Sequence, residues 1–299
     1  MQLPRSAEQR RLLGLAPALV TIGIFMVVPM FILLVFSFLE ADPYGGVEPV
    51  FSLDAYVQIL YEIDFDDSLI FNPIYLGIIW RSVVLALVAT VGCLILGFPV
   101  AYFITRQDAR TQNLLLYLIT LPFWTNQLVR VYSWILILSQ DGVIEQPLKA
   151  AGVIDDSLGM MYTNGAITIG LVYSYLPLMV LPIYASLEKL DFRLIEAAHD
   201  LYANRLKVMT KIIVPLAMSG ILAGCILVFV PSLGAFIAPD LLGGGKKLML
   251  GSLIQLQFAS SRNWPFGSAI AICLLCLVMA ALMIQARSAA RRRAMEESR

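Results

Sequence analysis

The sequence predicts an all-α, polytopic membrane protein with six transmembrane helices, because of its composition and its long apolar runs. The 299 residues are 59% hydrophobic and only 14% charged, with a mean hydropathy of +0.81. A soluble domain carries about 25% charged residues and about 45–50% apolar ones. This much apolar surface exceeds what one core of this length buries, so we expect lipid to surround the chain.

Six apolar runs are long enough to cross a bilayer, which takes about 20 helical residues. The predicted spans are 13–39, 76–105, 113–138, 165–187, 212–238 and 266–286. Arg5, Arg10 and Arg11 precede the first span, as in a signal peptide. However, the run is longer than a signal core of roughly 7–15 residues and lacks a small-residue cleavage site. We therefore expect a retained helix.

The distribution of Lys and Arg predicts that both termini face the cytoplasm. Fifteen of the 21 Lys and Arg residues fall on one side of the membrane when the N-terminus is inside. Cytoplasmic segments collect such an excess of positive charge. The chain then divides into a cytoplasmic N-terminus (1–12), a transmembrane domain (13–286) and a basic cytoplasmic tail (287–299).

The sequence offers no catalytic, metal or cofactor site. Its four cysteines lie within apolar runs, where a thiol packs as a small apolar residue: Cys93, Cys225, Cys273 and Cys276. The single histidine, His199, is expected to be exposed. The glycine-rich stretch before Lys246 lacks the G-x-x-x-x-G-K-[ST] spacing of a phosphate-binding loop. We therefore expect neither an enzyme nor a nucleic-acid-binding protein.

The predicted external segments are acidic. The first has no Lys or Arg and contains these carboxylates: Glu40, Asp42, Glu48, Asp54, Glu62, Asp64, Asp66 and Asp67. A later one adds Asp141, Glu145, Asp155 and Asp156. These side chains either solvate surface loops or attract a cationic substrate or a basic docking face.

The third span contains polar side chains in an otherwise apolar helix. An Arg at mid-membrane costs about 2.5–3.5 kcal/mol on insertion scales, so Arg130 either snorkels to the interface or faces a cavity or a partner. Asn126 and Gln127 are too short to snorkel, and they either line a cavity or join helices. In the fifth span, Pro231 and Gly234 predict a break. Asp240 after it belongs either to a gate or to a surface loop.

The segment between the fourth and fifth spans predicts a short amphipathic helix. Asp191 is a suitable N-cap, and Leu194, Ala198 and Leu201 recur at helical spacing. A basic turn with Arg205, Lys207 and Lys211 follows. Such a helix either lies on the membrane surface or docks into a groove of a partner.

This segment resembles the EAA loop of ABC importer permeases, whose pattern is E-A-A, three residues, Gly, nine residues, then I-x-L-P. The matching positions are Glu196, Ala197, Ala198, Ile212 and Pro215. Tyr202 replaces the usual Gly, and Val214 replaces Leu. Because Gly permits tight turning and close approach, we expect Tyr202 to alter the local geometry or a docking contact.

Other runs are similar to those of spermidine/putrescine permeases: LPFWTNQLVRVY (121–132), SLEKLD (186–191), PDLLGG (239–244) and NWPFG (263–267). The resemblance implies a type I ABC importer transmembrane domain in the bacterial inner membrane. The implied partners are a second homologous permease, two cytoplasmic ATP-binding subunits that hold the ATPase activity, and an extracytoplasmic substrate-binding protein.

The resemblance also implies roles for particular residues. The loop 188–211, with Glu196, Ala197, Ala198, Tyr202 and Pro215, would couple to the ATPase subunits. The substrate pathway candidates are Trp124, Asn126, Arg130 and Asp240. Two alternatives stay open: an ABC permease for another small solute (iron, sulfate or an amino-acid derivative), and a self-sufficient secondary transporter, which would be expected to carry carboxylates within its spans.

Overall fold

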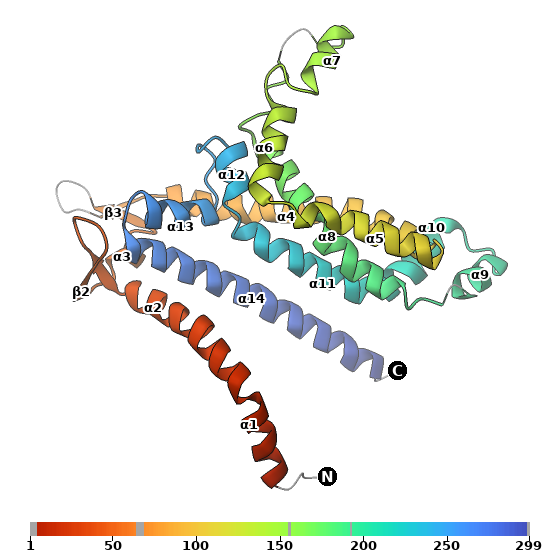
Figure 1. Cartoon of the computed structure of the whole chain (residues 1–299), viewed down its shortest axis with the longest axis horizontal. Helices are drawn as coiled ribbons and strands as arrows, with labels where there is room; N and C mark the ends of the chain where they lie inside the picture. The colour runs from red at the N-terminus through yellow and green to blue at the C-terminus, as the bar shows by residue number, and fades with distance from the viewer. Residues whose placement is uncertain (1–4, 64–68, 155–156, 192, 298–299) are drawn as a thin grey trace. The chain divides into compact units, whose positions relative to one another are not determined.

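The computed structural model describes residues 5–63, 69–154, 157–191 and 193–297, and it is helical along most of that length (Figure 1). Residues 1–75 and 254–299 form one compact unit, and residues 76–253 form the other. The predicted loop carboxylates Asp64, Asp66, Asp67, Asp155 and Asp156 lie outside the described residues, as do residues 1–4 of the N-terminal segment and 298–299 of the tail.

The first unit begins with a continuous apolar helix that confirms the first predicted span. It comprises α1 (Arg5–Ile22), the π-helical turn η1 (Gly23–Val27) and α2 (Val28–Phe36). None of the stretch Gly14–Phe36 is buried inside the chain. A helix this apolar without protein cover needs lipid or another chain around it.

The acidic segment after α2 contains two short antiparallel hairpins, which the all-helical prediction did not include. They are formed by β1 (Leu39–Ala41) with β2 (Val47–Phe51), and by β3 (Tyr61–Ile63) with β4 (Leu69–Phe71). The one-turn helix α3 (Asp54–Val57) lies between them. Aromatic side chains favour these strands, as in the stacked Phe38–Phe51 pair with ring centroids 6.1 Å apart.

The last helix of the first unit, α14 (Trp264–Glu297), confirms the sixth predicted span and continues through most of the predicted tail. It packs against α2, where the Phe36 and Trp264 rings stack with centroids 6.2 Å apart. Tyr75 meets Phe266 edge to face at 4.9 Å. Nothing in the sequence after Arg287 breaks the helix, since Ala and Arg are good helix formers.

The second unit is a helical bundle that contains the other spans and the predicted coupling loop. Its elements are α4 (Ile74–Thr105), α5 (Ala109–Trp124), α6 (Gln127–Leu138), α7 (Glu145–Ala150), α8 (Asn164–Leu187), α9 (Arg193–Asp200), α10 (Arg205–Val208), η2 (Met209–Ile213), α11 (Val214–Leu233), α12 (Ile237–Leu242) and the start of α13 (Leu250–Ala259).

The pairing of α8 with α11 is the main contact of this bundle, and glycines make it possible (Figure 1). A Cβ at Gly220 would overlap the Pro182 carbonyl oxygen, and one at Gly224 would lie 2.7 Å from the Met179 sulfur. Small residues let helix backbones approach closely in membranes, where packing rather than the hydrophobic effect holds helices together. Buried Met179, Val180 and Ile183 pack in the core beside this contact.

The third predicted span is the one that the structure changes most. The prediction of a single helix over 113–138 is wrong, because α5 and α6 meet at a 91° bend. Pro122 lies in the last turn of α5, and the side chain of Asn126 begins a new helix by accepting a hydrogen bond from the Leu128 N–H at 2.8 Å. The described chain thus has five candidate spans, or six if α5 and α6 together count as one.

The fifth predicted span is displaced towards the N-terminus. Its apolar helix runs over Arg205–Leu233 through the π-helical turn η2, so Arg205 and Lys211 are helical rather than part of a turn. The expected break occurs where Gly234 ends α11. The short helix α12 follows and packs against α6 and α8.

Candidate functional site

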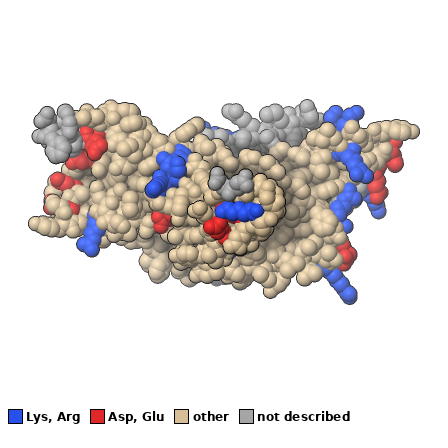
Figure 2. Space-filling view, turned by 90° about the horizontal axis from the view of Figure 1, so that it is seen from above, with Lys and Arg blue, Asp and Glu red and all other residues tan. Residues whose placement is uncertain are grey.

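The predicted coupling loop forms two short helices at one end of the second unit. The Asp191 carboxylate accepts a hydrogen bond from the Arg193 N–H at 3.0 Å, as expected of an N-cap, and α9 follows. Asn204 caps α10 in the same way through the Lys207 N–H at 2.8 Å. Lys, Arg, Asp and Glu side chains gather at the end of the unit that carries α9 and α10 (Figure 2).

Tyr202 ends α9 in a conformation that glycine usually supplies. Its φ is +57°, in the left-handed region. The Ala203 N–H donates to the Ala198 carbonyl at 3.0 Å, and the Tyr202 N–H donates to that of His199 at 2.9 Å. These two bonds define a Schellman C-cap, in which Gly normally occupies the position of Tyr202. Tyr202 thus adopts the backbone conformation that glycine would supply, and the expectation that it alters the local geometry or a docking contact stays a prediction; the residue is 97% exposed.

Replacing Tyr202 with glycine is expected to raise the thermal unfolding midpoint of the purified chain. A left-handed conformation costs an L-residue roughly 1–2 kcal/mol, of which glycine's greater unfolded-state entropy cancels part. Tyr202→Ala is the matched control, since it removes the ring but keeps the strain. Equal midpoints for the two variants would contradict a strained C-cap.

The helix α9 presents two different faces. Ile195 and Ala198 are buried in a core that includes Val208 and Ile213. Glu196 and Ala197 are exposed, and Glu196 forms no ion pair with any residue in the described ranges. Four large apolar residues are also exposed on α9, on α10 and between these helices: Leu194, Leu201, Tyr202 and Leu206. An exposed apolar surface beside charged residues is typical of a site that binds another protein.

Pro215 lies apart from this surface, in the first turn of α11, where the missing proline N–H leaves no hydrogen bond unmade. A proline is well suited to the start of the helix that follows η2, and this explains why a proline is found at this position of the EAA pattern. Local structure accounts for the side chain without a direct contact to a partner.

The structure brings three of the four pathway candidates to the junction of α5 and α6. Trp124 ends α5 with its side chain 86% exposed, and Asn126 caps α6. Arg130 lies one turn into α6, with its guanidinium carbon 6.0 Å from the centre of the Phe123 ring. Asp240 is exposed on α12, and in the described part of the chain it forms no ion pair with Arg130.

Arg130 is an unsatisfied charge in this unit. Its Nε and Nη1 atoms are buried and have no hydrogen-bond partner among the described residues. The residue as a whole is partly exposed, so snorkelling, a cavity and a partner all stay predictions for Arg130. A buried donor without an acceptor is unfavourable, so we expect a partner, one of the predicted alternatives, to supply the acceptor.

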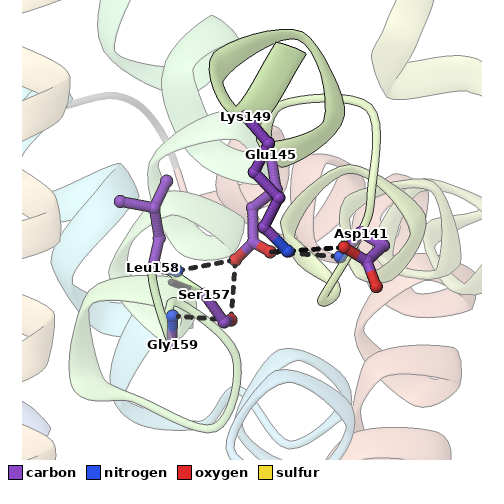
Figure 3. Close-up of polar contacts among 6 residues, drawn as sticks. All are labelled: Asp141, Glu145, Lys149, Ser157, Leu158 and Gly159. Atoms are coloured by element: carbon purple, nitrogen blue, oxygen red, sulfur yellow. Dashed lines mark hydrogen bonds and ion pairs between the residues drawn. The ribbon is translucent and has the colours of Figure 1, made fainter. Parts of the chain in front are cut away.

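Glu145 organises the segment between α6 and α8, a role that its sequence context did not reveal (Figure 3). Only 2% of its side chain is exposed. Its carboxylate accepts hydrogen bonds from the Asp141 N–H at 3.1 Å, the Ser157 hydroxyl at 3.0 Å and the Leu158 N–H at 2.9 Å. Lys149 reaches both Glu145, at 3.6 Å, and Asp141, at 2.5 Å. The interpretation of Glu145 as a solvated loop acid is therefore wrong. The one sequence feature that pointed to a structural role for Glu145 was its i,i+4 spacing from Lys149.

These contacts set the protonation behaviour of the segment. The Asp141 N–H, with the Ser157 and Leu158 donors and the Lys149 ammonium, holds the pKa of the Glu145 carboxyl below its ordinary value, against the effect of burial. A lowered pKa stabilises the folded segment above the ordinary carboxyl range. That stabilisation disappears as pH falls through the lowered pKa.

We expect Glu145→Gln to increase hydrogen exchange of residues 141–159 at neutral pH. We also expect it to remove the further increase that acid causes in the native chain. Glutamine offers one acceptor oxygen where the carboxylate offers two, and it carries no charge for Lys149. Hydrogen exchange of these amides, followed from neutral to acidic pH, measures both effects. Unchanged exchange at neutral pH would show that Glu145 does not fix the segment, and Glu48→Gln serves as the control on the other acidic segment.

Among the described residues, no group of three or more His, Cys, Asp or Glu side chains could hold a metal ion. The four cysteines are free thiols. Cys93 is buried, with its sulfur 3.5 Å from the Val172 carbonyl oxygen. Local packing therefore accounts for the environment of Cys93.

Solved structures share this fold. A chain of a bacterial ABC transporter that imports the acidic polysaccharide alginate aligns with a TM-score of 0.69 over 95% of this chain and 98% of that chain. A chain of a bacterial alginate ABC transporter in complex with an alginate pentasaccharide-bound periplasmic protein gives 0.72 over 97% and 98%. The sequence identities are 16% and 15%, so these similarities concern the fold.

Sequence comparisons define the family. Residues 93–294 match the binding-protein-dependent transport system inner membrane component. The spermidine/putrescine transport system permease protein PotB of Escherichia coli is 41% identical over 89% of this chain and 92% of its own length. The Haemophilus influenzae protein of that name is 40% identical over 87% and 86%. The Escherichia coli inner membrane ABC transporter permease protein YdcU is 32% identical over 68% of each chain. The chain therefore belongs to the inner membrane components of binding-protein-dependent transport systems, the family of ABC importer permeases.

Proposed function

We propose that this protein is the permease subunit of an ABC importer that moves spermidine and putrescine into the cytoplasm. The observation that carries the substrate assignment is the 41% identity to a spermidine/putrescine permease over nearly the whole length of both chains. Permeases for other solutes share the fold at much lower identity. Iron, sulfate and amino-acid derivatives are therefore less well supported as substrates.

The proposed assembly has four kinds of subunit. A second homologous permease encloses the pathway with this chain, two cytoplasmic subunits bind and hydrolyse ATP, and an extracytoplasmic protein delivers the substrate. The apolar outward surface of α9 and α10, with exposed Glu196 and Ala197 beside it, supports docking of the ATPase subunits there. The loop 188–211 would then transmit their movement to α8 and α11, because its buried residues share one core with these helices.

Both termini are proposed to lie in the cytoplasm, with 1–12 and 287–299 as cytoplasmic ends of the transmembrane domain 13–286. The positive charges of the sequence support this orientation. The segment fixed by Glu145 then lies on the external face, where the substrate-binding protein docks.

For the pathway, we propose that Trp124, Asn126, Arg130 and Asp240 lie close to the route of the substrate. The bend between α5 and α6 supports this, because non-helical backbone at membrane depth is tolerated where it lines a cavity or is covered by protein. An aromatic ring and a carboxylate suit a linear polyamine cation. The positive charge of Arg130 would repel such a cation unless a carboxylate neutralises it.

Uptake of labelled spermidine and putrescine into vesicles tests the proposal. The chain is co-expressed with its partner subunits, and transport is measured with and without ATP and with Glu196→Ala. We expect ATP-dependent uptake that falls at least about tenfold in the variant, the effect of losing one central docking contact. ATP-dependent uptake of a different solute would reject the polyamine assignment. Uptake by this chain alone, driven by an ion gradient, would reject the ABC mechanism.

A further inference from the structure

A cavity of about 360 Å³ lies between the end of α4 and the helices of the coupling loop. Its apolar wall includes the buried side chains of Ile195, Val208 and Ile213. Its polar wall consists of Tyr102, Arg106, His199 and Arg205. The cavity therefore brings together residues from four elements within the second unit: the end of α4, α9, α10 and η2.

The charged side chains around this cavity have one sign. Arg106 and Arg205 are cationic, His199 becomes so when protonated, and no carboxylate lines the cavity in the described part of the chain. The Arg106 guanidinium is held in place by the Tyr102 hydroxyl, at 2.6 Å from Nη2 and 3.1 Å from Nε. The wall is thus organised around cationic groups before any ligand arrives.

The other two basic residues leave donor or acceptor positions open. His199 Nδ1 lies 3.2 Å from the Ala203 carbonyl oxygen, so the Nε2 edge is the one that remains. The Arg205 side chain makes no hydrogen bond or ion pair with any residue that the structure describes. Arg106 and Arg205 both line the cavity, and an anion placed between two guanidinium groups interacts favourably with each of them.

We propose that this cavity binds a phosphate group. Arg guanidinium groups match the geometry of phosphate oxygens and bind them through charge-assisted hydrogen bonds. The ligand is either the headgroup of an anionic phospholipid or a soluble phosphate, since both present the same oxygens. A bound phosphate bridges Arg106 at the end of α4 and Arg205 on α10, so it steadies α9 between them. Phosphate binding in this cavity does not depend on the proposed function, whereas an effect of the bound phosphate on transport does.

Hydrogen exchange of residues 193–208 in the complete transporter tests the site. The transporter is placed in nanodiscs of phosphatidylcholine alone, in nanodiscs that also contain phosphatidylglycerol, and in phosphatidylcholine nanodiscs with added inorganic phosphate at matched ionic strength. Arg205→Gln is compared with Lys207→Gln, which makes the same charge change on the same helix away from the cavity. We expect Arg205→Gln to lower the affinity of the site for the protecting ligand at least about tenfold, which is the effect of losing one charge-assisted hydrogen bond.

The arms of the experiment distinguish the sources. Protection by phosphatidylglycerol that Arg205→Gln loses and Lys207→Gln keeps supports a lipid headgroup. The same pattern with inorganic phosphate supports a soluble ligand. Absence of protection in both arms overturns the proposal, and so does an equal loss in the two variants, which would indicate nonspecific charge. Because exchange is measured without transport, failure of this site leaves the polyamine assignment unaffected.

Discussion

Replacing Gly220 with leucine is expected to abolish stable folding of the second unit. Even a single Cβ at this position would overlap the Pro182 carbonyl oxygen, and backbone on a neighbouring helix cannot rotate away as a side chain can. Forced overpacking of a tight interface costs about 1–3 kcal/mol or more, and here the affected contact joins the two helices that share most of the core. The yield of monodisperse protein in detergent and its thermal midpoint measure the effect.

Gly165→Ala, in the facing helix α8, is the control. A Cβ there meets the Thr163 hydroxyl at 3.5 Å, an ordinary contact, and alanine is favoured over glycine in a helix by about 1 kcal/mol. We therefore expect no loss of stability in this variant. Normal yield and midpoint for Gly220→Leu would show that α8 and α11 have room to separate.

Replacing Arg130 with methionine is expected to separate the stability of the chain from its activity. Two buried nitrogens of Arg130 have no acceptor among the described residues, and methionine removes this unfavourable burial, so the isolated chain should be at least as stable as the native one. Uptake by the complete transporter should fall, because the acceptor supplied from outside this unit loses its partner. The thermal midpoint of the isolated chain and the vesicle uptake of the complex are the two measurements.

Arg130→Lys tests the same position with its charge retained. A lysine reaches an acceptor as a point charge but cannot bond through two nitrogens in a plane, so intermediate uptake is expected. If Arg130→Met destabilised the isolated chain, its buried nitrogens would have an acceptor within that chain. If it left uptake unchanged, Arg130 would have no role in the pathway or the assembly.

The short helices of the coupling loop illustrate what could be predicted locally. Asp191 and the spacing of Leu194, Ala198 and Leu201 predicted α9, because capping and helical periodicity act within a few residues. The apolar runs were likewise predicted from the local sequence. The break in the third span has local causes as well, in Pro122 and Asn126, but its 91° angle depends on how α5 and α6 pack against α8.

Other features depend on residues that are far apart in the sequence. Composition placed Glu145 in an acidic loop, whereas its burial comes from chain closure that brings Ser157 and Leu158 onto the carboxylate. Likewise, Arg106 and Arg205 share a cavity only because the end of α4 meets α10.

By itself, the sequence determined that this protein lies in a membrane, roughly where its spans run and to which family it is related, because hydropathy, capping and motif spacing are local properties of the chain. The tertiary structure alone decided that Gly220 contacts Pro182, that Glu145 is buried and that two Arg130 nitrogens have no acceptor among the residues it describes. These are properties of packing, in which the environment of a side chain is set by residues distant in sequence, and no local pattern specifies that environment.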